Sequence, residues 1–167
     1  MKRRSFITPL ALSTLMLLTP RVSRADMPPQ FLLEWGTQGS GSGQFQVLKG
    51  LTVDENGFVY ACDSGNARIQ KFDGIGNFAM SWGSFGSGNG QFSQPYGLHA
   101  DGSGHIFIAD AGNHRIQKFT TSGVFVSKFG SQGSGDGQFS APRGVTVTGN
   151  GDILVSDTFN HRIQKFD

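Results

Sequence analysis

The sequence predicts an all-β fold, a β-propeller built from four-stranded antiparallel blades, with three blades in the chain. The first observation is a motif, Asp-x-x-Asn-x-Arg-Ile-Gln-Lys-Phe, that starts at Asp63, Asp110 and Asp157, so its copies are 47 residues apart. A fixed period of roughly 20–50 residues is typical of repeat proteins. The second observation is that a full period holds four short strand patterns, and tandem four-stranded units of this length are typical of propeller blades.

Residues 1–25 are predicted to be a signal peptide. A basic start at 2–4 precedes an apolar run over 6–18, and the small residues Ser23 and Ala25 predict cleavage after Ala25. The apolar run is shorter than the roughly 20 residues that cross a bilayer, which favours a cleaved signal over a retained anchor. The Arg3-Arg4 pair resembles a twin-arginine signal, so general secretion and twin-arginine export both stay open. Either route predicts a periplasmic or extracellular protein.

Removal of this segment changes the net charge of the chain. It carries five of the 14 basic residues and none of the 12 acidic ones, so residues 26–167 have a net charge of −3. Because phosphate contacts dominate nucleic-acid affinity, this charge disfavours nucleic acid as a partner. No membrane contact is expected after cleavage. Cys62 is the single cysteine, which excludes an intrachain disulfide and a cysteine-based zinc site, and no cofactor is expected.

The rest of the chain divides into a lead over 26–42 and three repeats over about 43–89, 90–136 and 137–167. In the second repeat, the pattern predicts strands over 97–101, 105–109, 115–119 and 124–129. The second of these strands is apolar throughout, as in a strand covered on both faces, whereas the third alternates polar and apolar residues. The Gly/Ser-rich stretches lack the Lys-Ser/Thr pair of a phosphate loop and are predicted to link the blades; they span 39–43, 86–90 and 133–137.

The two ends of the array predict how a ring would close. Residues 31–36 match the fourth-strand pattern of 78–83, whereas the chain ends directly after a third strand. Three blades are fewer than the roughly 4–8 that close a propeller. We therefore expect a homodimer in which residues 31–36 of each copy complete the last blade of the other, which gives a six-bladed ring without an unpaired edge. The alternative is that the chain is a fragment of a longer array.

The sequence resembles the NHL-repeat family of β-propellers. The resemblance rests on the Asn-His-Arg element, on Gly-Gln-Phe and on Trp-Gly, at 113–115, 160–162, 43–45, 90–92, 137–139, 35–36 and 82–83. It covers roughly 31–167 and implies the propeller fold, although members of the family usually carry about six blades in one chain. Members include protein-interaction and RNA-binding scaffolds, extracellular sensor domains and a lyase acting on peptidyl-hydroxyglycine, so the resemblance implies no single function.

The repeated motif has two interpretations. Its polar residues are Asp63, Asn66, Arg68, Asp110, Asn113, Arg115, Asp157, Asn160 and Arg162. One interpretation is a cation site formed by the three carboxylates. The other is structural: an Asp three residues before an Asn caps the backbone donors of its own loop, and the Arg pairs with an Asp of the same or a neighbouring blade. The rotation between blades separates the three copies, so we favour the structural interpretation and assign neither metal ligands nor catalytic residues.

The four histidines occupy non-equivalent positions of the repeat. His114 and His161 stand where the first copy has Ala67, while His99 and His105 stand at two further positions. This arrangement does not predict a three-histidine zinc site.

The candidate ligand-binding residues are Lys49, Tyr96 and Arg143, each directly before a glycine that opens an innermost strand. In propellers this strand lines the central channel, so we expect the three side chains at its mouth. There they would bind a phosphate, a carboxylate or an acidic peptide segment through charge-assisted hydrogen bonds. The alternative is a solvated rim. The resemblance to the NHL family implies zinc-binding histidines at this position in its lyase branch, and the Lys, Tyr and Arg found here depart from that pattern.

These observations favour a non-enzymatic binding or scaffold propeller that recognises a protein, a peptide or an anionic small molecule at its rim face and channel mouth. The alternative is a propeller-type lyase or lactonase with a metal at the channel mouth. A third interpretation, RNA binding, is disfavoured by the net acidity and the export signal.

Overall fold

The computed structural model describes residues 28–167, so the predicted signal peptide lies outside the described residues. The chain divides into two units, Met1–Leu32 and Leu33–Asp167. The few described residues of the first unit form neither helix nor strand. In the part of the chain that the structure describes, no helix has the length and apolar character needed to cross a membrane.

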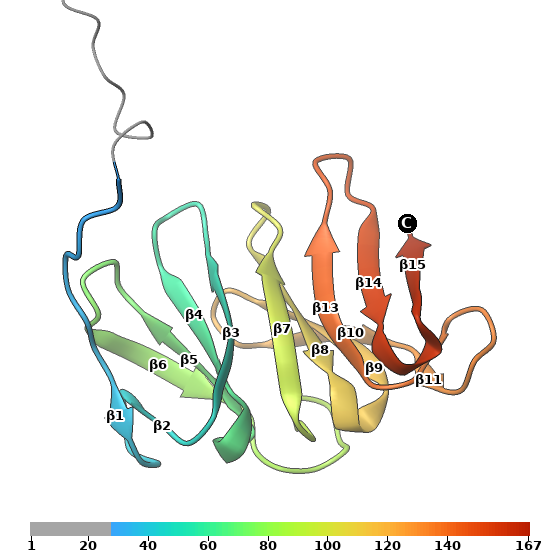
Figure 1. The fold of residues 1–167 in the computed structure, drawn as a ribbon, viewed down its shortest axis with the longest axis horizontal. Coiled ribbons are helices and arrows are strands. Elements are labelled where there is room, and N and C mark those ends of the chain that lie inside the picture. Colours follow the sequence, from blue (N-terminus) through green and yellow to red (C-terminus); the bar gives the residue numbers. More distant parts are fainter. Residues whose placement is uncertain (1–27) are drawn as a thin grey trace, which may run out of the picture. The chain divides into compact units, whose positions relative to one another are not determined.

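Three antiparallel sheets stand side by side in the second unit (Figure 1). Blade 1 has the strand order β3-β4-β5-β6, blade 2 has β7-β8-β9-β10, and blade 3 has β13-β14-β15. The strands of blade 1 are β3 Leu48–Val53, β4 Val59–Asp63, β5 Arg68–Phe72 and β6 Phe78–Trp82; those of blade 2 are β7 Pro95–Ala100, β8 His105–Asp110, β9 Arg115–Thr120 and β10 Phe125–Phe129; those of blade 3 are β13 Pro142–Val147, β14 Ile153–Asp157 and β15 Arg162–Phe166. The predicted all-β fold is confirmed, with four antiparallel strands in blades 1 and 2 and three in blade 3.

Short elements connect these strands. The predicted loop between the second and third strand is a single 3₁₀ turn in each blade, at Ser64–Asn66, Ala111–Asn113 and Thr158–Asn160. The linkers before blades 1 and 3 contain two-residue parallel pairs, namely β1 Thr37–Gln38 with β2 Gln44–Phe45 and β11 Ser131–Gln132 with β12 Gln138–Phe139. Residues 31–36, where a strand is expected, form none in the single chain. A strand needs a neighbour for its N–H and C=O groups, and no sheet edge pairs with these residues here.

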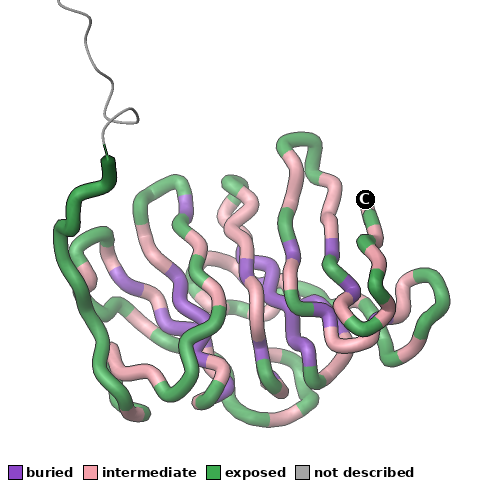
Figure 2. Tube along the Cα trace, in the orientation of Figure 1, coloured by how far each residue is buried: buried purple, intermediate pink, exposed green. Residues whose placement is uncertain are grey.

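The hydrophobic core lies between blades (Figure 2). One cluster joins Tyr60 and Ile69 of blade 1 to Leu98 and Ile108 of blade 2. A second cluster contains Ile116 of blade 2 together with residues of blade 3. Each blade thus buries a face only where another blade packs on it, as expected when a repeat cannot cover its own apolar surface.

Candidate functional site

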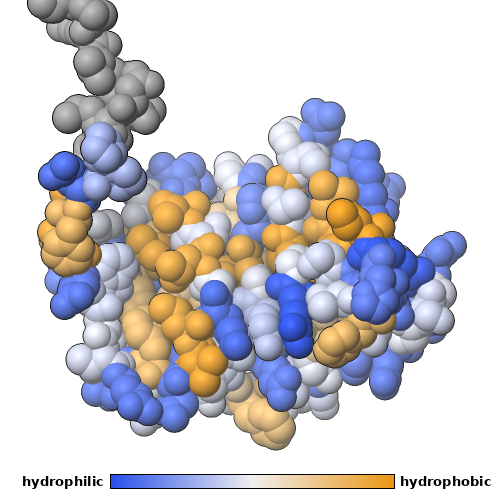
Figure 3. All heavy atoms as spheres, in the orientation of Figure 1, coloured by the Kyte–Doolittle hydropathy of each residue, from blue (hydrophilic) through white to orange (hydrophobic). Residues whose placement is uncertain are grey.

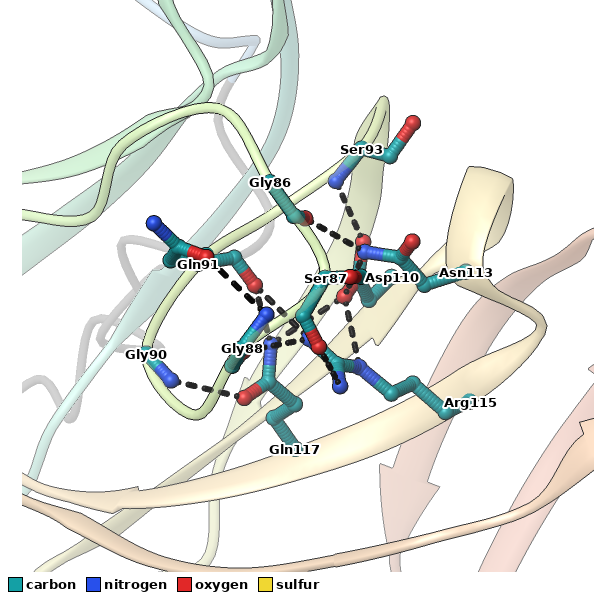
Figure 4. Close-up of polar contacts among 10 residues, drawn as sticks. All are labelled: Gly86, Ser87, Gly88, Gly90, Gln91, Ser93, Asp110, Asn113, Arg115 and Gln117. Carbon is teal, nitrogen blue, oxygen red and sulfur yellow. Dashed lines mark hydrogen bonds and ion pairs between the residues drawn. The ribbon is translucent and has the colours of Figure 1, made fainter.

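The repeated motif forms one polar network in each blade, and Figure 4 shows the network of blade 2. The side chain of Asp110 is fully buried. Its Oδ1 accepts the backbone N–H of Ser93 at 2.8 Å, and its Oδ2 accepts Asn113 Nδ2 and Arg115 Nε, both at 2.9 Å. Gln117 Nε2 donates to the same Oδ2 at 3.1 Å. All of these donors lie within one blade and the linker that precedes it.

Arg115 extends this network to the Gly-rich linker. Its guanidinium donates to the backbone carbonyls of Ser87, Gly88 and Gln91 at 2.7, 2.8 and 2.9 Å. Because a glycine-rich segment has little apolar surface of its own to bury, these bonds fix the path of the linker from blade 1 to blade 2. The motif therefore positions the entry of each inner strand.

The other two blades repeat this arrangement. The pairs Arg68–Asp63 and Arg162–Asp157 both have Nε–Oδ2 distances of 2.9 Å. Burial of Asp157 acts to raise its pKa. The hydrogen bonds that it accepts from the Ser140 N–H and from the side chains of Asn160, Arg162 and Gln164 outweigh this effect, so the pKa of Asp157 lies below its ordinary value.

One detail of the structural interpretation is wrong. The Asp carboxylate does not cap the backbone of its own loop, because the 3₁₀ turn closes on itself with bonds such as His114 N–H to the Ala111 carbonyl. The carboxylate instead accepts an N–H of the preceding linker, that of Gln46, Ser93 or Ser140. Within residues 28–167, no group of three or more His, Cys, Asp or Glu side chains lies close enough to hold a metal ion.

The structure brings the three candidate rim residues, which lie on the adjacent inner strands β3, β7 and β13, into one row. Lys49 Nζ lies 4.8 Å from the ring centroid of Tyr96, and the guanidinium carbon of Arg143 lies 4.8 Å from the same centroid. Arg143 also lies 5.2 Å from the ring of Phe159. We call Lys49, Tyr96, Arg143 and Phe159 the aromatic–cation strip. At these distances each cation is attracted by the ring quadrupole.

Two glycines explain how these side chains come so close. A Cβ on Gly50 would lie 2.6 Å from the carbonyl oxygen of Tyr96, and a Cβ on Gly97 would lie 2.5 Å from that of Arg143. Any other residue would therefore push the inner strands apart. Each glycine directly follows a strip residue, so the close strand contact and the stacking of the side chains have the same origin.

Both cations of the strip, Lys49 and Arg143, are exposed. Among the described residues, no carboxylate lies within ion-pairing distance of Lys49 or Arg143. Sequence reasoning missed Phe159, which occupies the position of Gly65 and Gly112 in the other repeats. That difference between repeats was the signal that could have identified it.

Three of the four histidines have a polar neighbour among the described residues. His105 Nδ1 lies 3.2 Å from Asp101 Oδ2, and His114 Nδ1 accepts the backbone N–H of Ala141 at 3.1 Å. His99 Nδ1 lies 3.5 Å from Thr146 Oγ1 across the inner strands. The side chain of His161 stays exposed at the open face of blade 3.

The sequence pattern of the NHL repeat matches residues 45–72, 92–119 and 139–166, which together make up half of the chain. The chain belongs to the NHL repeat family. Each match covers the first three strands of one blade, and the fourth strands β6 and β10 lie outside the matches. No curated protein sequence matches this NHL chain.

Solved structures share the fold of this NHL chain at low sequence identity. A streptogramin B lyase is 17% identical with a TM-score of 0.55, and the match covers 75% of this chain and 41% of the lyase. An auxiliary nutrient binding protein from Bacteroides thetaiotaomicron is 16% identical with a TM-score of 0.58, covering 77% and 38%. A gluconolactonase from Xanthomonas campestris is 14% identical with a TM-score of 0.54, covering 72% and 38%. The NHL chain thus spans about two fifths of each structure, and the likeness shows the fold alone.

Proposed function

We propose that this NHL chain is a non-enzymatic, exported binding propeller that holds an anionic ligand at the aromatic–cation strip. One observation carries the proposal: Lys49 and Arg143 both lie on the Tyr96 ring, and no described residue gives either cation an acidic partner. These three positions differ between otherwise similar repeats. The residues that do repeat, the Asp, Asn, Arg and Gln of the motif, form the polar network that stabilises each blade. Specificity is therefore expected where the repeats differ.

The chemistry of the strip favours a carboxylate or phosphate group. Arg143 presents a planar fork that can bind such a group through two parallel hydrogen bonds, while Lys49 adds a point charge. Both cations are held beside the Tyr96 ring, so less side-chain freedom is lost when a ligand binds. An acidic peptide with several carboxylates would engage both cations at once.

We further propose that the functional form is a six-bladed ring made from two copies. A ring of this size lies within the usual range of roughly 4–8 blades. It would bring two strips to one channel mouth, with four cations and two tyrosines. The net charge of −3 expected after signal cleavage disfavours nucleic acid as the ligand.

The binding proposal is tested by titration calorimetry with a hexaglutamate peptide and with inorganic phosphate. Charge-assisted hydrogen bonds contribute about 1.5–3 kcal/mol each, so Arg143→Ala should weaken binding about tenfold or more. The double variant Lys49→Ala/Arg143→Ala should abolish it. The matched control is Lys128→Ala, which removes one exposed charge from β10 and should leave the affinity unchanged. Equal affinities for the wild type and the double variant would refute the site.

A metal analysis of the purified protein addresses the alternative of a propeller-type lyase or lactonase. Stoichiometric zinc or calcium would favour the enzyme, because such chemistry at a channel mouth uses a bound cation to polarise the substrate. Binding of the acidic peptide without bound metal would favour the binding module.

A further inference from the structure

We infer that the open face and free edge of blade 3 form a docking surface for a second copy of this chain, joined head to tail. In this arrangement, β3 of the second copy covers the face of blade 3, and its residues 31–35 pair with β15. The inference deepens the ring proposed above. It does not depend on ligand binding at the strip.

The face of blade 3 lacks the cover that its repeats have. Ile163 is 74% exposed, whereas the equivalent Ile69 and Ile116 are completely buried under the next blade. Around Ile163 lies a shallow pocket of about 290 Å³ formed by residues of β13, β14 and β15, including Val145, Leu154 and Ser156. At the two internal junctions, between blades 1 and 2 and between blades 2 and 3, the inner strand of the following blade covers the equivalent face.

Blade 1 carries the complementary face. Leu51 on β3 is 60% exposed, whereas the equivalent Leu98 and Val145 are 6% and 9% exposed because the preceding blade covers them. Leu48 and Val53 on the same strand are also exposed. Apolar side chains are visible in this part of the molecule in Figure 3. Blade 1 therefore has the residues that cover a preceding blade, but the described part of the chain contains no such blade.

Gly144 supports the same pairing at the level of the backbone. At the two internal junctions, the glycine of one inner strand lies against a carbonyl of the next, Gly50 against Tyr96 and Gly97 against Arg143. The equivalent Gly144 has no such neighbour, and the nearest atom to an added Cβ is Oγ of Ser156 in its own blade. In the proposed dimer, the carbonyl of Lys49 from the second copy occupies this place.

The free edge of β15 predicts the second contact. Among the described strands, β15 pairs only with β14, whereas β5 and β9 each have a fourth strand on their outer side. In blade 1, Lys71 pairs with Met80 and Gln70 with Ser81. Lys165 and Gln164 occupy the positions of Lys71 and Gln70 in blade 3, and Leu33 and Glu34 occupy the positions of Met80 and Ser81 in the N-terminal segment. The same register therefore pairs Lys165 with Leu33, and Gln164 with Glu34, of the second copy.

Trp35 already lies where a fourth strand would end. The ring centroid of Trp35 is 6.1 Å from that of Phe72, and a Cβ on Gly76 would lie 2.8 Å from Cδ2 of Trp35. Trp82, at the end of the fourth strand of blade 1, packs in the same way on Phe119 and Gly123 of blade 2. The residues just before Trp35 therefore lead into blade 1 in the way that the fourth strand of blade 1 leads into blade 2.

A second copy is the occupant because one chain carries both halves of the junction. Blade 3 offers an apolar face and the open edge of β15. Blade 1 offers the matching face of β3, and residues 31–35 offer the strand that the edge lacks. Such a heterologous contact either closes or continues as a fibre. Two copies of three blades reach a typical ring size and close, which also removes the unpaired edge.

The first test measures the cover of the face. Ser156→Cys places a thiol at the position equivalent to Cys62, which is completely buried between blades 1 and 2. By light scattering, this variant should be a dimer. A maleimide should label its introduced thiol at least tenfold more slowly than in the double variant Ser156→Cys/Ile163→Asp, which should be a monomer. Cys62 serves as the buried internal control. A monomer at all concentrations with rapid labelling of the introduced thiol would overturn the inference.

The second test measures the strand pairing and its register. Leu33→Cys and Lys165→Cys in separate chains should give a disulfide-linked dimer after mixing and oxidation, whereas Glu34→Cys with Lys165→Cys should not, because adjacent strand residues point to opposite faces. Neither single variant should cross-link alone. Failure of the first pair to link, in a protein that is dimeric, would overturn the strand exchange. Because no ligand is present, this outcome is independent of the anion-binding test.

Discussion

Blades 2 and 3 have nearly the same motif but very different surroundings. Blade 2 lies between two neighbours, and its Arg115 and Ile116 are buried. In blade 3, Ile163 is exposed and the Arg162 side chain is 29% exposed, although Arg162 makes the same 2.9 Å bond to its Asp. The comparison separates two contributions to the stability of a blade. The polar network forms within every blade and its linker, whereas the burial of apolar side chains depends on the adjacent blade.

The largest expected effect comes from removal of the carboxylate at the centre of the network. Asp110→Ala removes the carboxylate that pairs with the buried Arg115 and leaves the backbone N–H of Ser93 without its acceptor. Loss of one partner of a buried ion pair costs about 3–5 kcal/mol. Asp157→Ala should cost less, because Arg162 can reach water. Urea unfolding of both variants measures the difference. Equal losses of unfolding free energy in the two variants would show that the contribution of the network does not depend on its burial.

A second substitution pair addresses the apolar contribution. Ile116→Ala should lower the free energy of unfolding by about 2–5 kcal/mol, as is typical for truncation of a buried isoleucine. Ile163→Ala should change it by about 0.5 kcal/mol or less in a dilute, unpaired chain. In the proposed dimer, Ile163→Ala should instead weaken the association. A large loss in the monomer would mean that the face of blade 3 is covered by something other than a second copy.

The same contrast explains what the sequence could predict. The strands of the second repeat and the position of Lys49, Tyr96 and Arg143 on inner strands followed from the 47-residue period, because a repeat imposes one local structure on every copy. The role of the motif Asp residues could be predicted only in part. Whether each carboxylate caps its own loop or accepts an N–H of the preceding linker depends on a tertiary contact, such as that of Asp110 with Ser93. Phe159 was not predicted because it lies in the Thr158–Asn160 turn, and its contact with Arg143 on β13 is a tertiary contact.

The distances between the side chains of the aromatic–cation strip likewise could not be predicted from the sequence. The glycines Gly50 and Gly97 were visible as strand openings, but their contacts with carbonyl groups of the next blade were not. These contacts set the separation of the inner strands and thus place both cations on Tyr96.

The smallest expected effect is a pH dependence of blade 3. The pKa of Asp157 is held below its ordinary value of about 3.9. Its ionised form therefore stabilises the fold above that value, and the contribution is lost as the pH falls through the lowered folded-state pKa. Urea midpoints measured between about pH 6 and pH 2 should converge for the wild type and Asp157→Asn at the acid end, because the Asn variant cannot ionise. The exposed Asp136, substituted to Asn as a control, should leave the profile unchanged. A constant difference between wild type and Asp157→Asn over this range would show that the carboxylate contributes through shape and not through its charge.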